Sequence, residues 1–387
     1  MTVRVKNARL LLPEGIEENK YLYFEQGCIT AVTAEELPFD EEIDAAGLYA
    51  APGFIDLHVH GGGGADFTED DEEDILHAID HHAYHGTTTI YPSTVAAACD
   101  TLRGALRRLR NAIQSGRALA NVPGVHLEGP YFSPAQCGAQ NTAFITPPVP
   151  EDYESLLAEY GDIIKRWSLA PELPGSREFL QRIHAAGVVS SMGHTNAKYD
   201  DVLMAMEEGC RLITHFYSCI STITREKGYR KLGVMECGYL MDELDVEAIA
   251  DGCHIPAELF RLLYKVKGAE HICLVTDALR CCGNEGEHSS VGGVACVIKN
   301  GVAVLPDESA FAGSIATTDR LVRFCVQQVG IPLVEAVRMA SANPARVMGL
   351  EKKGRLAEGC DADLVFFDED IQVKKVYVMG KAIREDV

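Results

Sequence analysis

Short stretches near both ends of the chain alternate between apolar and polar residues. Val3, Val5, Ala8 and Leu10 begin this pattern, and residues 21–24, 28–32, 363–367 and 376–378 continue it. Alternation with a period of two is typical of a half-buried β-strand. Because the two ends of a chain often lie close together in a fold, we predict a small β-sandwich domain of antiparallel strands from residues 1–52 and 346–387.

The middle of the chain, residues 53–345, follows a different rhythm. Short apolar runs alternate with segments of helical periodicity. The helical segments cover residues 72–85, 101–114, 176–186 and 200–208, and the apolar runs include 88–90, 124–127, 188–192, 212–214 and 272–276. A repeated strand-then-helix order over about 290 residues predicts an α/β fold, a (β/α)8 TIM-type barrel.

The charge of the chain indicates which classes of partner it can bind. The 387 residues contain 35 Lys and Arg against 57 Asp and Glu, so 35 − 57 gives a formal net charge of −22. This balance disfavours nucleic acid and anionic membranes as partners, because both are bound through clustered positive charge.

No apolar run approaches the ~20 residues of a membrane helix. Residues 1–12 do not resemble a signal peptide, and thirteen cysteines without a C-x-x-C pair indicate reduced thiols. We therefore expect a cytoplasmic protein.

Residues that can bind metal ions fall at the ends of the predicted strands. His58 and His60 close the run 53–60, and residues two apart on a strand face the same side. Four further candidates each close a later apolar run: Glu128, His194, His215 and Asp277. Because strand ends converge on one face of a parallel barrel, we predict a metal centre there. Imidazole and carboxylate groups without a thiolate suit Zn²⁺, Fe²⁺ or another borderline divalent ion.

Two other histidines are interpreted from their surroundings. His254 follows the apolar run 248–250 within Asp251-Gly-Cys-His, so we expect it on a loop that faces the substrate. His126 precedes Glu128 by two residues, and we expect it behind the ligands or in the core. The glycines 61–64 lack the Lys-Ser or Lys-Thr of a phosphate-binding loop, and no G-x-S-x-G nucleophile elbow occurs. The pattern therefore favours metal-dependent chemistry.

Several motifs together resemble one known family. The run Pro52-Gly-Phe-Ile-Asp-Leu-His-Val-His-Gly is similar to the signature of the amidohydrolase superfamily. His126-Leu-Glu-Gly-Pro-Tyr, Gly193-His-Thr-Asn-Ala, Val275-Thr-Asp-Ala and Ser341-Ala-Asn-Pro-Ala-Arg resemble, in this order, the N-acetylglucosamine-6-phosphate deacetylases. The chain is identified as a divergent member of that family. The resemblance implies a homodimer that hydrolyses the acetamide of N-acetylglucosamine 6-phosphate, or of a related N-acetylhexosamine 6-phosphate, to acetate and an amino sugar phosphate.

The resemblance also implies residue roles. Glu128, His194 and His215 hold the main divalent ion, most suitably Zn²⁺, and His58 with His60 allows a second ion that Glu128 bridges. Asp277 is implied as a metal ligand and as the catalytic acid and base, and His254 as a catalytic group that contacts the sugar or polarises the carbonyl. The implied substrate-binding residues are Ala139, Gln140, Ser218, Cys219, Arg225, His254, Phe311, Ala312 and Gly313.

The chain departs from the family pattern near the substrate. Ser218 and Cys219 stand where the family has Asn-Ala, and Gln140 stands where it has His. Arg225 keeps the position of an arginine that pairs with the substrate phosphate, and a guanidinium is suited to bidentate phosphate binding. It begins a basic stretch, residues 225–231. Two other interpretations stay open: an amidohydrolase for another substrate, such as an N-acyl amino acid or a cyclic amide, and a catalytically inactive scaffold.

Overall fold

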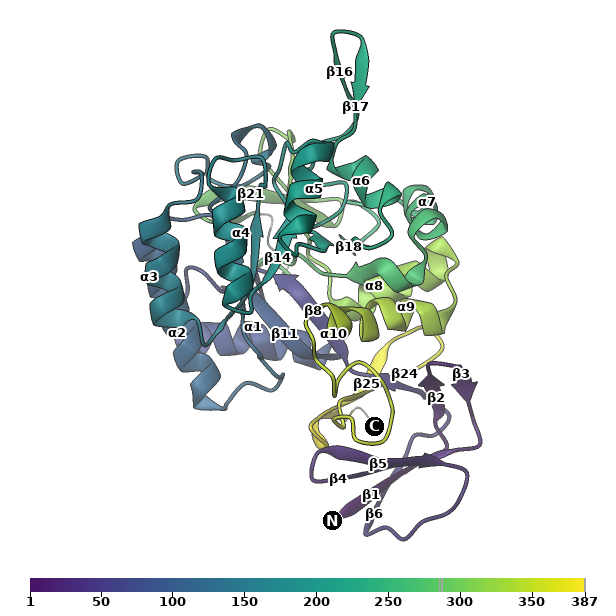
Figure 1. Cartoon of the computed structure of the whole chain (residues 1–387). Helices are drawn as coiled ribbons and strands as arrows, with labels where there is room; N and C mark the ends of the chain where they lie inside the picture. Colours follow the sequence, from purple (N-terminus) through teal and green to yellow (C-terminus); the bar gives the residue numbers. More distant parts are fainter. Residues whose placement is uncertain (285, 287, 386–387) are drawn as a thin grey trace.

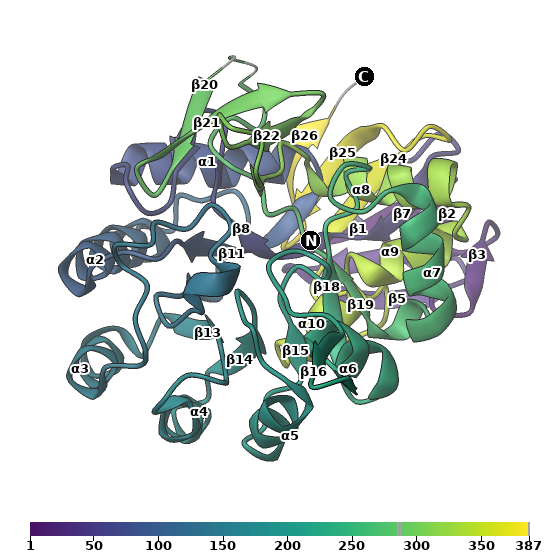
Figure 2. The ribbon, with the colours of Figure 1, turned by 90° about the horizontal axis from the view of Figure 1, so that it is seen from above.

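A nearly closed barrel of eight parallel strands makes up the larger part of the protein (Figures 1 and 2). The structure is a computed structural model that describes residues 1–284, 286 and 288–385. Along the sheet the strands follow the chain order: β8 (Phe54–Val59), β11 (Thr87–Thr94), β12 (Val125–Glu128), β13 (Ile164–Leu169), β14 (Val189–Met192), β15 (Leu212–Ile213), β18 (Asp245–Ala248) and β19 (Ile272–Leu274). Neighbouring strands are parallel throughout. The predicted TIM-type barrel is confirmed.

The first and last strands of the barrel meet just beyond their C-terminal ends. The amide of Asp277 donates to the carbonyl of His58 at 2.8 Å, and the amide of His60 donates to the carbonyl of Ala278 at 2.8 Å. Below these bonds, Asp56 accepts from the amide of Thr276 at 3.2 Å and from its hydroxyl at 2.5 Å. Residues far apart in the sequence are thereby joined at the barrel mouth, where the sequence predicts the metal ligands.

Helices follow the barrel strands and lie outside the sheet, as Figure 2 shows for α2 to α5. The helices are α1 (Glu72–Tyr84), α2 (Cys99–Ser115), α3 (Pro150–Tyr160), α4 (Ser176–Ala185), α5 (Tyr199–Glu207), α6 (Val234–Leu240), α7 (Ala257–Lys267), α8 (Thr318–Phe324), α9 (Leu333–Met339) and α10 (Ala342–Val347), with short turns η1 (Pro134–Gln136), η2 (Ala269–His271) and η3 (Cys325–Val329). The four helices predicted from periodicity are α1, α2, α4 and α5. Local chemistry fixes the start of α1, where the Asp71 carboxylate accepts from the amides of Glu73 and Asp74.

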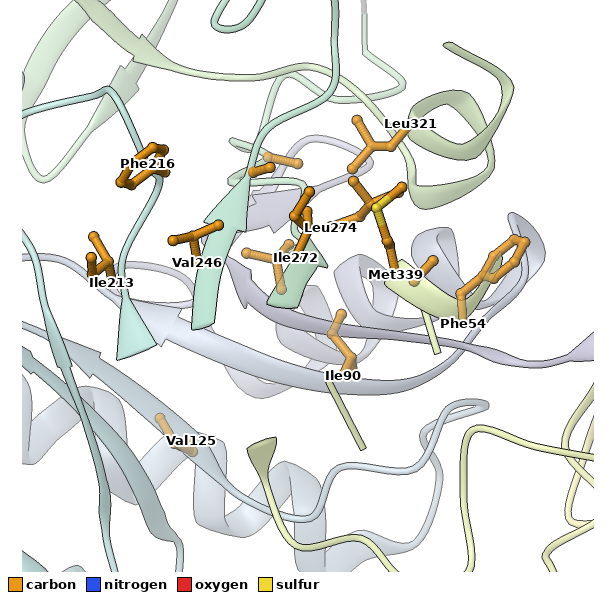
Figure 3. Close-up of a cluster of buried hydrophobic side chains, with 14 of the residues drawn as sticks. Phe54, Ile90, Val125, Ile213, Phe216, Val246, Ile272, Leu274, Leu321 and Met339 are labelled. Atoms are coloured by element: carbon orange, nitrogen blue, oxygen red, sulfur yellow. The ribbon is translucent and has the colours of Figure 1, made fainter. Parts of the chain in front are cut away.

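Apolar side chains between the sheet and the helices form the main core. Figure 3 shows part of it, where Phe54 of β8 and Ile272 of β19 lie near Leu321 of α8 and Met339 of α9; all four are fully buried. Because alternate strand residues point to opposite sides, the other set fills the barrel interior. That interior set contains polar groups as well as apolar ones, and these groups lie beneath the barrel mouth.

Strands from both ends of the chain form two further sheets. One contains β1 (Thr2–Lys6), β4 (Tyr21–Glu25), β5 (Cys28–Thr33) and β6 (Glu41–Asp44); the other contains β2 (Arg9–Leu12), β3 (Gly15–Glu17), β7 (Tyr49–Pro52), β24 (Leu364–Phe367), β25 (Val373–Val378) and β26 (Lys381–Glu385). Val5 and Phe24 of the first sheet share a buried cluster with Leu10 and Phe366 of the second. The predicted small sandwich from both termini is confirmed.

One detail of the small domain differs from the prediction. The β1–β6 and β2–β7 pairs are parallel, although antiparallel strands are predicted. Alternation of apolar and polar residues reports which face of a strand is buried, but it carries no information about the direction of the neighbouring strand.

Two insertions near the barrel mouth are not predicted as elements. One is the antiparallel sheet β20 (His288–Val291), β21 (Val294–Lys299), β22 (Val302–Val304) and β23 (Phe311–Gly313). The other is the hairpin of β16 (Thr224–Glu226) and β17 (Tyr229–Lys231), which projects from the top of the barrel in Figure 1. The short pair β9 (Gly61–Gly62) and β10 (Ala65–Asp66) follows the first strand. Among the described residues, no helix has the length and hydropathy needed to cross a membrane.

Candidate metal centre and active-site cavity

The barrel delivers all six predicted ligands to one place. His58 lies in β8 and His60 follows it, with 3.2 Å between their Nε2 atoms. Glu128 is the last residue of β12. The remaining ligands lie two or three residues beyond their strands: His194 after β14, His215 after β15 and Asp277 after β19. Short overhangs of this kind place side chains over the barrel mouth rather than in its wall.

The six side chains form two groups, and Glu128 of the second group also contacts the first. His58, His60 and Asp277 form one group, and Glu128, His194 and His215 form the other; within each group the ligand atoms lie within 4.8 Å of one another. Oε1 of Glu128 lies 3.2 Å from Nε2 of His194, 3.1 Å from Nε2 of His215 and 3.3 Å from Nε2 of His58. Its Oε2 lies 3.4 Å from Nε2 of His60. Glu128 therefore stands between the two groups.

Three of the ligands have an unusual backbone conformation. φ is +46° at His194, +28° at His215 and +46° at Asp277. Residues other than glycine rarely adopt this left-handed region, and such strain clusters at functional sites. The conformation turns each side chain from the direction of its strand toward the centre of the mouth.

The donor set fits a divalent metal ion. Every histidine of the cluster uses Nδ1 as a donor to an oxygen: His58 to Glu247 Oε2, His60 to the Ser93 carbonyl, His194 to the Gln136 carbonyl and His215 to the Ser218 carbonyl. Each Nε2 then faces the centre of the cluster, where a metal ion would bind it. Imidazoles oriented in this way, together with buried carboxylates, are characteristic metal ligands.

The electrostatics of the cluster follow from burial and from close opposite charges. Burial alone would lower the pKa of His58, but Glu128 and Asp277 raise it to about 10. Burial would raise the pKa of Glu128, but the imidazoles of His58 and His194 hold it well below its usual range. Burial would likewise raise the pKa of Asp277, which His58 and His60 lower. In the metal-free protein both carboxylates are ionised and His58 carries a proton that a metal ion would displace.

A cavity of about 230 Å³ opens beside this cluster. Five of the six ligands line it, whereas His58 lies beneath them, fully buried. The predicted substrate-binding residues that line it are Ala139, Gln140, Ser218, Cys219, His254, Phe311, Ala312 and Gly313. All eight line the same cavity, and their roles in substrate binding stay predictions.

Two cavity residues are held by neighbouring polar groups. Oε1 of Gln140 accepts from the amide of Ala96 at 2.8 Å, which turns Nε2 toward Glu128 Oε2 at 2.5 Å. His254 donates from Nδ1 to Asp251 Oδ2 at 2.7 Å, and its ring lies 4.8 Å from that of Phe311. The carboxylate of Asp251 thereby leaves Nε2 of His254 as the free ring nitrogen.

Arg225 does not lie with the other predicted residues. It is exposed on the hairpin β16–β17 and is not part of the cavity lining. The backbone hydrogen bonds of this hairpin hold Arg225 opposite Arg230. The sequence pattern identifies a basic stretch here but contains no signal for how far it projects.

Several residues near the site are not predicted from the sequence. Asn141, Val291 and Gly292 line the cavity, the last two because the inserted sheet lies over the mouth. Arg166 and Glu247 lie beneath the ligands, inside the barrel. The sequence signal that could identify Arg166 and Glu247 is a charged residue within a short strand, in Ile164-Lys-Arg-Trp and Asp245-Val-Glu-Ala. His126 is buried between the hydroxyls of Ser93 and Ser168, behind the ligands as expected.

Comparison with known proteins places this site in a family. The amidohydrolase family matches residues 49–383. The chain is 31% identical over 385 residues to the N-acetylglucosamine-6-phosphate deacetylase of Lysinibacillus sphaericus, covering 98% of this chain and 97% of the relative. It is also 31% identical over 385 residues to the N-acetylgalactosamine-6-phosphate deacetylase of Escherichia coli O157:H7, covering 98% and 99%.

A solved structure agrees with this placement. The N-acetylglucosamine-6-phosphate deacetylase of Pasteurella multocida superimposes with a TM-score of 0.91 at 28% sequence identity, covering 99% of each chain. The similarity therefore includes the barrel, the terminal sheets and the insertions between them. The chain belongs to the amidohydrolase family, and within it to the group that contains the N-acetylglucosamine-6-phosphate deacetylases.

Proposed function

We propose that the protein hydrolyses the acetamide of an N-acetylhexosamine 6-phosphate, with N-acetylglucosamine 6-phosphate as the first candidate substrate. The observation that carries this proposal is the placement of Asp277. Its carboxylate lines the cavity and lies 3.2 Å, Oδ1 to Nε2, from His60. An ionised carboxylate is thus held beside His58 and His60 at the wall of the cavity.

Asp277 is proposed to carry out the proton transfers of the hydrolysis. A divalent ion, when bound, lowers the pKa of a water molecule and polarises the acetamide carbonyl. Asp277 removes a proton from the attacking water and later delivers it to the nitrogen of the leaving amine. Its lowered pKa keeps it ionised, and therefore ready to act as the base, at neutral pH. The products are acetate and the free amino sugar phosphate.

His254 is proposed to hold the substrate in the same cavity. Asp251 fixes the ring through Nδ1, so Nε2 is free to contact the sugar or the carbonyl oxygen. Phe311, adjacent to the His254 ring, offers an apolar surface to the sugar. Gln140 is positioned by Ala96 and Glu128 and borders the same space. His254, Phe311 and Gln140 together restrict how the sugar ring can lie.

The phosphate requires positive charge, which the described lining of the cavity does not include as Lys or Arg. We propose that Arg225 supplies it from the hairpin, in a homodimer whose contact involves this arm. Ile223 and Tyr229 are 50% and 77% exposed on the same arm, and Leu240 of α6 is 61% exposed. Exposed apolar residues beside a basic arm suit contact with the strongly acidic surface of a second copy.

We propose Zn²⁺ as the ion, with Fe²⁺ as the alternative, in one or two copies according to whether His58 and His60 bind their own. The cytoplasm is the proposed compartment, in keeping with thirteen free cysteines, most of them buried. The proposed domain limits are 1–52 with 346–387 for the sandwich, and 53–345 for the barrel.

The test is an acetate-release assay with the purified, Zn²⁺-loaded protein. The panel contains N-acetylglucosamine 6-phosphate, N-acetylgalactosamine 6-phosphate and the corresponding sugars without phosphate. We expect release from a phosphorylated sugar and little from the free sugars. Activity on an N-acyl amino acid or a cyclic amide instead would contradict the proposal.

The role of Arg225 is tested separately with Arg225→Ala. We expect KM for the phosphorylated substrate to rise by about tenfold or more with little change in kcat, since a charge-assisted hydrogen bond contributes about 1.5–3 kcal/mol. Lys227→Ala removes the same charge from the turn of the same hairpin and serves as the control. Equal effects of the two variants would show that only the general charge of the arm matters.

A further inference from the structure

Two charged side chains lie inside the barrel, directly beneath the ligand cluster. Glu247 comes from β18 and Arg166 from β13, and neither side chain is exposed to solvent. A buried ion pair is rarely a gain in stability over well-packed apolar residues of the same volume. Packing alone therefore does not account for this pair.

One oxygen of Glu247 contacts both ligand groups. Oε2 lies 3.2 Å from Nδ1 of His58 and 3.2 Å from the backbone amide of His215. His58 belongs to the group with His60 and Asp277, whereas His215 belongs to the group with Glu128. The carboxylate of Glu247 is thus shared between the two halves of the centre.

Arg166 holds this carboxylate in place. Its Nη1 forms an ion pair with the other oxygen of Glu247, Oε1, and also donates to the carbonyl of Leu57 at 2.8 Å. Its Nη2 donates to the hydroxyl of Ser191 at 3.1 Å. Because Leu57 immediately precedes His58, the guanidinium ties Glu247 to the strand that carries the ligand.

The carboxylate of Glu247 requires a proton on Nδ1 of His58. The guanidinium of Arg166, which forms an ion pair with Oε1, balances the negative charge of the buried Glu247 carboxylate. An ionised carboxylate can only accept hydrogen bonds. Nδ1 of His58 must therefore be the donor, and Nε2, which faces Glu128 and Asp277, is the nitrogen that would bind a metal ion.

His58 differs in this respect from the other three histidines. His60, His194 and His215 donate from Nδ1 to backbone carbonyls. A carbonyl carries no net charge, whereas a carboxylate behind an imidazole makes it a stronger ligand and fixes its orientation. Among the described ligands, His58 alone has a charged partner of this kind.

We propose that Glu247, held by Arg166, is a positioning residue of the metal centre, which orients the His58 imidazole for metal binding and fixes its place relative to His215. The proposal rests on the metal centre of the proposed function but not on its substrate. It predicts that the affinity of the His58 group for a metal ion depends on Glu247, although Glu247 is not itself a predicted ligand.

The test measures Zn²⁺ affinity directly, by competition of the metal-free protein with a chromophoric chelator and without substrate. In Glu247→Gln, the amide oxygen is drawn to Arg166, so the NH₂ group faces Nδ1 of His58 and drives its proton to Nε2. We expect the ion at His58 to bind about 10–100-fold more weakly. His58→Ala, measured in parallel, identifies the binding step that belongs to this group.

A second variant guards against a folding defect, because Glu247→Gln leaves Arg166 buried with a weaker partner. Arg166→Met with Glu247→Leu replaces the whole pair by apolar side chains, an exchange that proteins often tolerate. We expect this double variant to unfold near the wild-type temperature yet to show the same weakened Zn²⁺ binding. Asp245→Asn, which removes a charge paired with Arg346 at the start of the same strand, is the matched control and should bind Zn²⁺ normally.

Two results would overturn the proposal. One is wild-type Zn²⁺ affinity in the folded double variant, which would reduce the pair to a structural role. The other is an unchanged visible absorption spectrum of the Co²⁺-loaded Glu247→Gln protein, since a reoriented imidazole alters the ligand field. Normal Zn²⁺ binding by wild-type protein that releases no acetate contradicts the proposed function and leaves this proposal intact.

Discussion

Replacing Asp277 by Asn tests the centre of the proposed mechanism. Asn has almost the same shape and tolerates the left-handed conformation found here, φ +46°. The backbone bonds that Asp277 makes to His58 and Ser314 do not involve its side chain. We therefore expect a folded protein with an unchanged barrel mouth, in which only the carboxylate is lost.

The size of the effect follows from what else lines the cavity. Glu128 is the other carboxylate of the described lining, and its oxygens already contact His194, His215 and Gln140. It cannot take over the proton transfer. A positioned general base contributes about 10²–10⁴-fold, which at 1.36 kcal/mol for each tenfold corresponds to about 3–5 kcal/mol of the barrier. We expect kcat to fall by that factor.

The assay is acetate release under saturating substrate, combined with metal analysis of the same sample. Because Asp277 also belongs to the His58 and His60 ligand group, a parallel measurement in excess Zn²⁺ separates a lost base from a lost ion. Asp307→Asn, in an exposed turn, serves as the control. A kcat within tenfold of wild type at full metal content would refute the role of Asp277.

Three further predictions concern metal binding and stability. Removing the metal with a chelator should lower Tm, because free ion at about 1,000 times Kd stabilises the fold by about 4 kcal/mol; an unchanged Tm in differential scanning fluorimetry would argue against a bound ion. Zn²⁺ binding should release protons at pH 7, because the pKa of His58 is about 10 without metal and the ion displaces its proton. The affinity for Zn²⁺ should therefore rise as the pH increases toward that value. Calorimetry in buffers of different ionisation enthalpy measures the proton release. Leu10→Ala should lower the free energy of unfolding by about 2–5 kcal/mol with kcat unchanged, because Leu10 is fully buried in the small sandwich. Urea unfolding measures the stability and the acetate assay measures kcat. A reduced kcat would show that the sandwich shapes the site.

The sequence predicts the architecture of this protein well because periodicity reports burial. Alternation with a period of two marks both sets of terminal strands, and the strand-then-helix rhythm marks the barrel. The ligands are predictable for the same reason, since each stands where an apolar run stops. The direction of β6 beside β1 is not predictable, because parallel and antiparallel neighbours bury the same alternating residues.

Other features of the site arise only from contacts between distant residues. Glu247 is the second of two acidic residues in a short strand, and its role depends on Arg166 and His58 from two other strands. The position of Arg225 depends on the length and the pairing of a hairpin, which the basic composition of residues 225–231 does not encode. The inserted sheet β20–β23 matters to the site because it lies over the mouth and contributes Val291 and Phe311 to the cavity.

The joining of the first and last barrel strands has a consequence for how the protein is assembled during synthesis. His58, His60 and Glu128 leave the ribosome long before Asp277, yet the amide of Asp277 binds the carbonyl of His58 in the finished barrel. A nascent chain therefore presents only a partial ligand set until its last barrel strand emerges. The predicted ion site of His58, His60 and Asp277 is therefore incomplete until translation has passed that strand. The sheet that contains β24 to β26 is completed later still, so the order of synthesis sets the order in which the centre and then the small domain mature.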